Sequence, residues 1–351
     1  MHYFLFDREG KRQGPLQNVT SIQWKPKYYD TGTAEIHVEY TDFNVKYLQK
    51  WNRIVCQERN EILFIESVER ASSEIIVRGH MDNLEDRVNL YTWTVNNVEQ
   101  SLLDNFAKNK RDLDIVIGEK TGLPAKLENT SDTTYDTLRV MAQDYCQRVG
   151  YGYREILKGN VLNYFEIYTG SVRQNVRFSD KLGNMISQTF IEDISSYKNY
   201  AYVYGEESES DRKRVVVDIR EGTEPRMEMY VDARDLQSTY TDTSGNEQTY
   251  TEAEYLAMLK ERGLKKLAEA RSESTSFSFD LLTQDAKAVL RKDFDLGDVI
   301  PCMSFKFNLF AFVRVVGLKF VEESNQETAV TLELELVSLQ ETASDMKGGS
   351  S

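Results

Sequence analysis

The chain has 351 residues, a mass of 40.6 kDa and a formal charge of -14, from 57 acidic and 43 basic residues. A chain of this length is more often divided into several domains than folded around a single hydrophobic core. The acidic balance argues against a protein that binds nucleic acid irrespective of sequence, because its surface repels phosphate. With 40% hydrophobic residues, we expect a folded, water-soluble chain and not a disordered acidic segment.

Signals for secretion, membrane insertion and disulfide bonding are missing. Asp7 and Arg8 interrupt the first apolar stretch, which argues against a secretory signal. The most apolar window, residues 305–321, contains three basic residues that a membrane span would not tolerate there: Lys306, Arg314 and Lys319. The cysteines are far apart and odd in number: Cys56, Cys146 and Cys302. They predict neither a disulfide framework nor a paired metal-ligand motif, and they favour folding in a reducing cytoplasm.

The first ninety residues show strand patterns separated by turns. An aromatic run at Tyr3–Phe6 precedes a turn, and Ala34–Tyr40 alternates with Ile36, Val38 and Tyr40 on one face. Two β-branched runs, Ile62–Val68 and Glu74–Gly79, flank a hairpin turn at residues 70–73. This block predicts a small sheet or barrel.

Helical patterns follow Trp93. Asn96 or Asn97 could cap a helix that places Val98, Leu102 and Phe106 on one side. A second helix is predicted over Thr134–Val149, because apolar residues repeat at helical spacing and Gly150 stands where the helix would end. Two β-like runs, residues 151–157 and 161–169, then surround a turn. This segment predicts mixed α and β structure.

Strand patterns return in the last half of the chain. Residues 201–204 and 214–219 form a predicted hairpin around a charged loop, and Thr251-Glu252-Ala253-Glu254 predicts a capping box that opens a helix to about Arg271. The remaining strands are predicted around Phe277 and Phe279, at 299–307 and 310–321 on either side of Asn308, and at 331–336. The predicted fold class is α+β, mostly β.

Motifs for catalysis or cofactor binding are missing from the sequence. No phosphate-binding loop occurs, Gly150-Tyr151-Gly152 lacks the third glycine of a dinucleotide fingerprint, and no serine-nucleophile elbow is present. The histidines lack the spacing of a zinc site: His2, His37 and His80. We predict no catalytic residue, no cofactor and no metal.

Carboxylates are the one open chemical question, because glycosidase acid pairs leave no local motif. Glu66, Glu69 and Glu74 near a strand turn could form such a pair, but an acid-rich chain makes solvated surface the favoured reading. A third possibility is a glycan-binding or receptor-binding tip that uses an exposed tryptophan: Trp24, Trp51 or Trp93.

One cluster of tyrosines is less ordinary. Tyr200, Tyr202 and Tyr204 alternate along a predicted strand, so one face of that strand would consist of tyrosine. Interfaces are enriched in tyrosine, and we predict these three residues as a possible subunit interface. The edge of a sandwich core is the alternative.

Four stretches, taken in order, carry a family resemblance: Tyr28–Ile36, Ile65–Glu69 with Val77–Gly79, Val176–Met185 leading to Ser196–Gly205, and Phe294–Val299. In the last, Gly297 permits a tight bend and Asp298 can bond local amides before the next strand. Together the chain, over about residues 21–337, resembles the tail-hub or baseplate-hub proteins of long-tailed bacteriophages and prophages. That family includes the amino-terminal structural module of tail-associated lysins.

This resemblance implies a domain plan. Hub proteins of this kind have two small β-barrel-like domains per chain and mixed α/β domains beside them. The plan places a first barrel-like domain at residues 1–91, a mixed α/β domain at 92–175, and a second barrel-like domain at 176–339 with an inserted helix at 251–271. Residues 340–351 are expected to be a disordered tail.

The resemblance also implies a structural role in the virion tail, with assembly in the bacterial cytoplasm. A homotrimer would present six barrels below a sixfold tail tube, bind distal tail proteins and a fibre or spike, and let DNA pass. The acidic charge fits this role, because negative walls keep DNA from adhering. The alternatives are a cell-wall-degrading glycosidase or peptidase, which the length of the chain argues against, and the glycan-binding tip.

Overall fold

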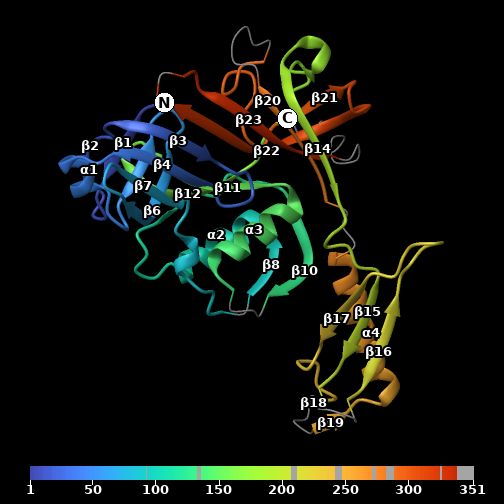
Figure 1. The fold of residues 1–351 in the computed structure, drawn as a ribbon. Coiled ribbons are helices and arrows are strands. Elements are labelled where there is room, and N and C mark those ends of the chain that lie inside the picture. Colours follow the sequence, from blue (N-terminus) through green and yellow to red (C-terminus); the bar gives the residue numbers. More distant parts are fainter. Residues whose placement is uncertain are drawn as a thin grey trace. The chain divides into compact units, whose positions relative to one another are not determined.

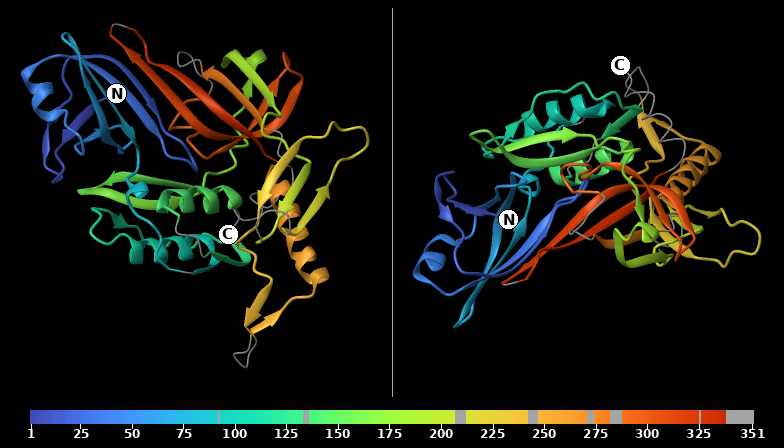
Figure 2. Two further views of the ribbon diagram at one scale, coloured as in Figure 1. Left: turned by 60° about the horizontal axis from the view of Figure 1, so that its bottom comes forward. Right: turned by 90° about the horizontal axis from the view of Figure 1, so that it is seen from above.

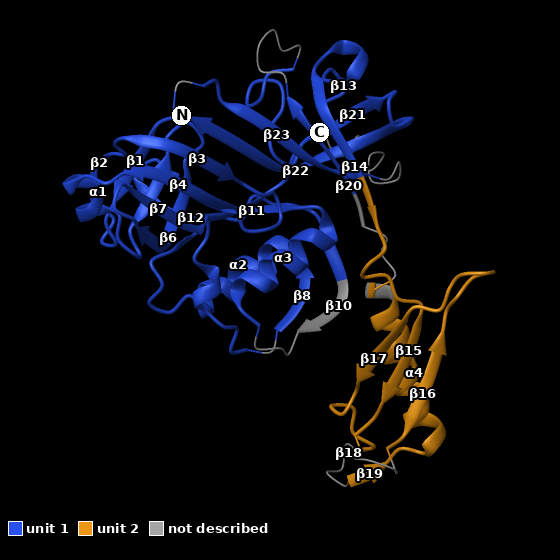
Figure 3. Ribbon diagram, viewed as in Figure 1, with its two compact units in different colours: residues 1–190, 276–351 blue, residues 191–275 orange. Residues whose placement is uncertain are grey.

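A computed structural model describes residues 1–91, 93–132, 136–206, 212–241, 247–270, 274–281, 288–324 and 326–337. The chain divides into two compact units (Figure 3): unit 1 comprises Met1–Phe190 and Ser276–Ser351, and unit 2 comprises Ile191–Thr275. Strands predominate in both, so the predicted mostly β fold is confirmed. None of the helices in the described part of the chain is long and apolar enough to cross a membrane.

The first lobe of unit 1 is an antiparallel sheet (Figure 1) with the order β2-β1-β5-β6-β7-β4-β3. Its elements are β1 (Tyr3–Phe6), β2 (Arg12–Pro15), β3 (Val19–Lys25), β4 (Thr33–Glu39), α1 (Asp42–Tyr47), β5 (Arg53–Cys56), β6 (Glu61–Arg70) and β7 (Glu74–His80). The predicted alternation buries Ile36 and Val38, whereas Tyr40 lies beyond the strand and is exposed. The predicted hairpin of β6 and β7 is confirmed, with a bulge between Ile65 and Ser67.

A layer with two helices follows. Its elements are η1 (Leu84–Asp86), β8 (Trp93–Asn97), α2 (Val98–Asn109), β9 (Val116–Ile117), β10 (Lys126–Asp132), α3 (Leu138–Val149), β11 (Gly152–Lys158) and β12 (Val161–Tyr168). The caps follow the sequence: Asn97 accepts a hydrogen bond from the Gln100 amide, and Gly150 ends α3 at a φ of +69°. Residues 134 and 135 of the predicted helix lie outside the described residues, and Asp136 and Thr137 precede α3, with Thr137 as its N-cap. The β11–β12 hairpin joins β6 through Ile156 and Glu61, and its apolar side chains pack with α2 and α3.

The second lobe has the strand order β13-β21-β22-β23-β20-β14. Its elements are β13 (Phe178–Ser179), η2 (Asp180–Leu182), β14 (Met185–Asp193), β20 (Ser274–Leu281), β21 (Val299–Ser304), β22 (Leu309–Glu323) and β23 (Ala329–Val337). The last residues of β22 pair with β3, with Phe320 opposite Trp24, so this long strand belongs to both lobes (Figure 2). The strand pairs of the described residues close neither lobe into a barrel.

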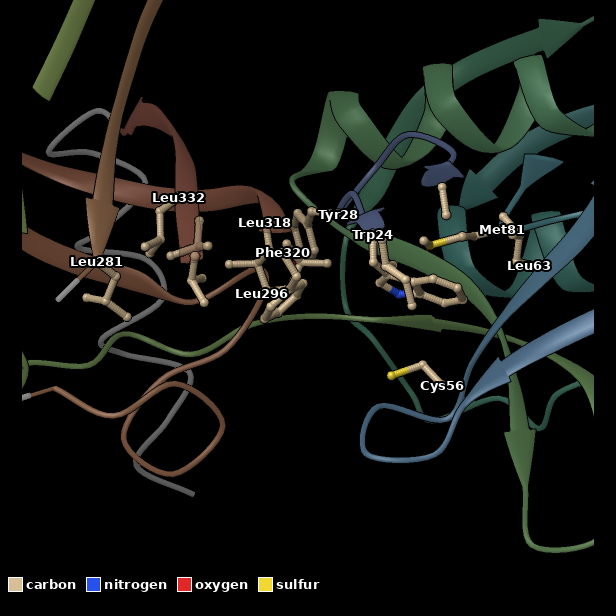
Figure 4. Close-up of a cluster of buried hydrophobic side chains, with 14 of the residues drawn as sticks. Trp24, Tyr28, Cys56, Leu63, Met81, Leu281, Leu296, Leu318, Phe320 and Leu332 are labelled. Atoms are coloured by element: carbon tan, nitrogen blue, oxygen red, sulfur yellow. The ribbon is translucent and has the colours of Figure 1, made fainter. Parts of the chain in front are cut away.

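A single hydrophobic cluster runs through both lobes (Figure 4). It extends from Leu281 and Leu332 in the second lobe, past Leu318 and Phe320 on β22, to Trp24 in the first. Burial of apolar surface is the main favourable term in folding, so a shared cluster favours folding of the two lobes as one body. This explains why the lobes fall in one unit.

Unit 2 is a small sheet with a helix on one face. Its elements are β15 (Tyr200–Tyr204), β16 (Arg214–Asp218), β17 (Glu228–Asp232), β18 (Thr239–Thr241), β19 (Glu247–Thr249) and α4 (Glu252–Ala270), and its main sheet has the order β16-β15-β17. The predicted β15–β16 hairpin and the Thr251–Glu254 capping box are confirmed. Helix α4 approaches the sheet closely at Gly263, which has no Cβ, since an added Cβ there would lie 2.6 Å from Val203.

The predicted domain plan divides the chain differently from these units. It assigned the helix of residues 251–271 to a second barrel-like domain at 176–339, whereas that helix lies in unit 2 with the rest of residues 191–275. The domain boundaries of the plan stay a prediction. The predicted disordered tail at 340–351 lies outside the described residues.

Candidate assembly surfaces and the junction between the lobes

The two lobes and the helical layer of unit 1 meet at Tyr28. Its side chain is fully buried, and its hydroxyl donates to the Gly150 carbonyl at 3.0 Å and accepts from the Gly170 amide at 3.1 Å. Its main-chain amide donates to Val316 of β22, and its carbonyl accepts from Tyr153 of β11. One residue therefore links three substructures of unit 1.

Glycines make this approach to Tyr28 possible. A Cβ at Gly152 would lie 2.4 Å from the Tyr28 ring, and a Cβ at Gly297 would lie 2.3 Å from it. Gly297 also has a φ of +91°, which side chains other than glycine rarely adopt. The tight bend predicted at Gly297 is thus confirmed. The bend places the backbone of Gly297 against the ring of Tyr28, which is near the other end of the chain.

Ion pairs, each with at least one buried partner, surround the Tyr28 junction. Asp298 accepts hydrogen bonds from the amides of Asp295 and Ser171 and from Arg173, at 2.7–2.9 Å. Its predicted bonding to local amides is therefore confirmed. Arg59 pairs with Glu61 at 2.6 Å and with Asp295 at 3.1 Å. Paired charges avoid the cost of isolated burial, so these contacts favour one arrangement of the lobes.

Among the described residues, a cavity of about 210 Å³ beside the junction is lined by four buried acids: Glu61, Asp82, Glu155 and Asp298. Glu155 is 1% exposed and accepts a hydrogen bond from the Asn83 amide, but its Oε2 has no partner among the described residues. Burial, together with the nearby charge of Asp82, raises the pKa of Glu155 well above its ordinary value. Asp82 pairs with Arg139 at 2.9 Å. Glu155 therefore holds a proton at a pH at which an ordinary glutamate has lost it.

The tyrosine face of unit 2 is the side of its sheet that α4 does not cover. Ala201 and Val203 point to the helix and are buried, whereas the alternating tyrosines lie on the other side and are half-buried. The alternation predicted from the sequence is confirmed. Pairing of β15 with its neighbours assigns nine residues to this face: Tyr200, Tyr202, Tyr204, Arg214, Val216, Asp218, Glu228, Tyr230 and Asp232.

Arginines lie over the rings of the tyrosine face. The Arg226 guanidinium is 4.4 Å from the Tyr200 ring centre, and Arg212 is 5.3 Å from the Tyr204 ring centre. Arg212 also donates to the Tyr230 hydroxyl at 2.9 Å. Such contacts are cation–π interactions, and tyrosine and arginine are both enriched at binding hot spots.

A second candidate surface, which we name the phenylalanine tip, lies at the β21–β22 turn of unit 1. It consists of Phe305, Phe307 and Phe310, with exposed fractions of 49%, 36% and 55%. The rings of Phe305 and Phe310 pack edge to face with centres 5.2 Å apart. Adjacent exposed aromatics on a folded protein indicate a contact surface. The sequence predicted strands on either side of Asn308 and argued against a membrane span here, but the phenylalanines were not singled out as a contact surface, although their close spacing beside Asn308 was the available signal.

The chain's relatives agree with this architecture. A sequence profile of the Siphovirus ReqiPepy6 Gp37-like protein family matches residues 3–334. The chain belongs to this family. The resemblance to siphovirus and prophage tail proteins that we drew from four stretches of sequence is therefore confirmed. No curated protein sequence matches this family member.

Solved tail proteins share the fold of this siphovirus-family chain at low sequence identity. The tail protein from Neisseria meningitidis MC58 is 13% identical, with a TM-score of 0.54 over 95% of this chain and 96% of that chain. The 43 kDa tail protein of prophage MuSo2 from Shewanella oneidensis is 12% identical, with a TM-score of 0.55 over 96% and 98%. Prophage tail protein gp18 from Listeria monocytogenes EGD-e is 14% identical, with a TM-score of 0.50 over 99% of both.

The reactive side chains of this tail-family protein are held in structural contacts. All three cysteines are buried and unpaired, and burial raises the pKa of Cys56 and of Cys302 to about 12, so both thiols stay protonated at neutral pH. His37 bonds Glu35 and Glu74, and these hydrogen bonds raise its pKa. Within the described ranges, no group of three or more metal-ligating side chains could hold a metal ion.

The candidate carboxylates and tryptophans of the alternative functions lie in different environments. Glu66 accepts a hydrogen bond from His80 and Glu74 contacts His37, whereas Glu69 pairs with Arg78, so these acids are held in contacts with basic side chains at the surface. Trp24 is fully buried and donates its indole N–H to Glu61. The prediction of Trp24 as an exposed glycan-stacking residue is therefore wrong. Trp51 is 69% exposed, and Trp93 is half-buried beside α2.

Proposed function

We propose that this protein is a structural, non-enzymatic hub of a phage tail tip or baseplate. Three chains form a ring that joins the tail tube to the tip and lets DNA pass through its axis. The observation that carries this proposal is the two-lobed sheet of unit 1, in which β22 belongs to both lobes. Three copies bring six such lobes around one axis, which suits contact with a sixfold tube.

Two surfaces are suited to the contacts of this ring. The phenylalanine tip offers exposed apolar area, whose burial favours association. The tyrosine face, including the predicted interface residues Tyr200, Tyr202 and Tyr204, offers flat aromatic area with arginines above it. We assign the phenylalanine tip to contacts between copies. The tyrosine face, which the sequence predicted as a possible subunit interface, we assign instead to contacts with neighbouring tail proteins.

The charge of the chain suits the passage of DNA. Each copy carries a formal charge of -14, so three copies surround the axis with strongly negative protein. Like charges repel DNA over about one Debye length, roughly 8 Å at physiological salt. The ring therefore guides DNA without binding it. In this proposal, the protein acts in the virion tail after assembly in the host cytoplasm, together with tail-tube, distal tail and fibre or spike proteins.

The test measures oligomeric state and shape. Light scattering coupled to size-exclusion chromatography should give the mass of three 40.6 kDa chains, and electron micrographs should show a threefold ring. Phe310→Asp should shift the protein toward monomer, because it places a charge on apolar contact area. The matched control is Tyr40→Asp at an exposed aromatic outside the phenylalanine tip, which should remain trimeric. A monomer at every attainable concentration, or a closed particle without an axial opening, contradicts the proposal.

A further inference from the structure

A groove of about 650 Å³ lies along one side of α2 in the helical layer of unit 1. Its wall on the helix is one stripe of side chains four residues apart, Gln100, Asp104 and Lys108. Its opposite wall comes from Tyr91 and from Trp93 and Asn96 of β8. The volume falls within the range of roughly 300–1,000 Å³ that is typical of small-molecule sites.

The hydrogen-bonding groups of this groove are mostly unused within the chain. The side chains of Thr94, Asn96, Gln100 and Lys108 are exposed and make no hydrogen bond to another described residue. Amide groups both donate and accept, so they match hydroxyl groups, which also do both. The floor is already satisfied, because Asn105 donates to Asn89 and accepts from Asn109. The groove therefore combines a fixed polar floor with amide side chains above it that are unpaired within the described residues.

Two aromatic rings complete the groove. Tyr91 is 54% exposed. Trp93 packs edge to face on Tyr145 of α3, with ring centres 5.2 Å apart, and this contact fixes its orientation. The face of an aromatic ring is electron-rich and attracts weakly positive C–H groups, such as those on one face of a pyranose ring.

We propose that this groove binds a short, uncharged oligosaccharide, with Tyr91 and Trp93 against the sugar rings and Asn96 and Gln100 on the hydroxyls. This inference goes beyond the structural role proposed above and does not depend on it. A polyanion fits poorly, since the groove offers two lysines and the chain is strongly acidic. An apolar ligand fits poorly because the lining is mostly amide, hydroxyl and charged.

The groove is suited to binding rather than to hydrolysis. Glycoside hydrolysis ordinarily requires two carboxyl groups that flank the scissile bond. Among the described residues that line the groove, Asp104 is the only acid, and Lys120 holds it in an ion pair at 2.9 Å. We therefore expect a bound saccharide to be recovered intact.

The experiment uses the full chain. An array of bacterial cell-wall and capsular glycans, with maltohexaose, cellohexaose and chitohexaose as soluble probes, should reveal binding that calorimetry then quantifies. Tyr91→Ala should weaken the affinity of the best probe about tenfold by removing one ring. Gln100→Ala should weaken it about threefold through loss of hydrogen bonds, and it should not disturb α2, because Gln100 is exposed and alanine favours helix.

The matched control is Tyr40→Ala, an exposed tyrosine in the first lobe that is not part of the groove. It should bind the probe with unchanged affinity, and all three variants should show the circular dichroism of the parent chain. Absence of binding to every glycan overturns the inference, as does equal binding by the parent and by Tyr91→Ala and Gln100→Ala. Preferential binding of a single-stranded oligonucleotide or an extended peptide at this site also overturns it. Release of shortened saccharides overturns the expectation that the groove only binds.

Discussion

Tyr28 of unit 1 and the tyrosine face of unit 2 place the same side chain in opposite environments. In unit 1, Tyr28 is fully buried, its hydroxyl has two main-chain partners, and glycines lie against its ring. In unit 2, Tyr200, Tyr202 and Tyr204 lie on an uncovered sheet face, where arginines approach their rings. The difference teaches that a tyrosine can stabilise a fold by satisfying buried backbone groups or can leave stability unchanged and provide a surface for a partner.

The largest effect on stability is expected from a substitution that adds a side-chain atom at the Tyr28 junction. Gly297→Ala adds a Cβ 2.3 Å from the Tyr28 ring at a φ of +91°, so we expect a loss of ~3 kcal/mol in the free energy of unfolding. Chemical denaturation measures this loss. Gly183→Ala is the matched control, because its φ is +71° but its added Cβ meets nothing within 4 Å. It should lose only ~1 kcal/mol, and equal losses would argue against the Tyr28 contact.

Removal of one tyrosine hydroxyl in each environment tests the comparison between Tyr28 and the tyrosine face with a smaller change. Tyr28→Phe leaves the buried Gly170 amide without its acceptor, so we expect a loss of ~1–3 kcal/mol in the free energy of unfolding. Tyr202→Phe removes a hydroxyl from the tyrosine face, where water can replace it, and should change that free energy by less than ~0.5 kcal/mol. Equal effects in both variants would mean that the two environments do not differ as described.

The pH dependence of stability tests the buried acid beside the junction. Because the folded state raises the pKa of Glu155, its contribution is fully present below pH 4.5 and is lost as pH rises through the folded pKa. Glu155→Gln removes this loss, so the stability of the variant relative to the parent should increase as pH rises above 4.5. Chemical denaturation at a series of pH values measures the difference.

Glu99 provides a control of opposite sign. Burial alone would raise its pKa, but hydrogen bonds from Thr121, Leu123 and Gly122 outweigh burial and lower it. Its contribution is therefore present above pH 4.5 and is lost as pH falls through the folded pKa. Glu99→Gln should become less stable than the parent as pH rises, and the same trend in both variants would contradict the assignments.

The tyrosine face should contribute more to binding than to stability. Truncation of Tyr202 and Tyr230 together to alanine removes aromatic area that α4 does not contact, so the midpoint of unfolding should change little. The same double variant should weaken binding to purified neighbouring tail proteins, measured by co-sedimentation. A large loss of stability with unchanged binding would assign these tyrosines to folding.

Much of the local structure could be predicted from the sequence. The β15 alternation, the end of α3 at Gly150 and the Thr251–Glu254 capping box each depend on residues within a few positions of one another. The contact surfaces were harder to predict. The phenylalanine tip was missed because the β21–β22 pairing decides which of its rings remain exposed, and Trp24 was misassigned because burial depends on strands far away in the chain.

The sequence alone determined the strand and helix patterns, the acidic charge and the family resemblance, since periodicity, capping residues and conformationally special glycines act locally. Only the tertiary structure decided that β22 pairs with β3, that Gly297 lies on Tyr28, and that Glu155 lies near Asp82. The physical reason is the distance along the chain between the residues that interact. A local pattern states which face of an element is apolar, but the packing of all elements together decides which distant residue lies against that face.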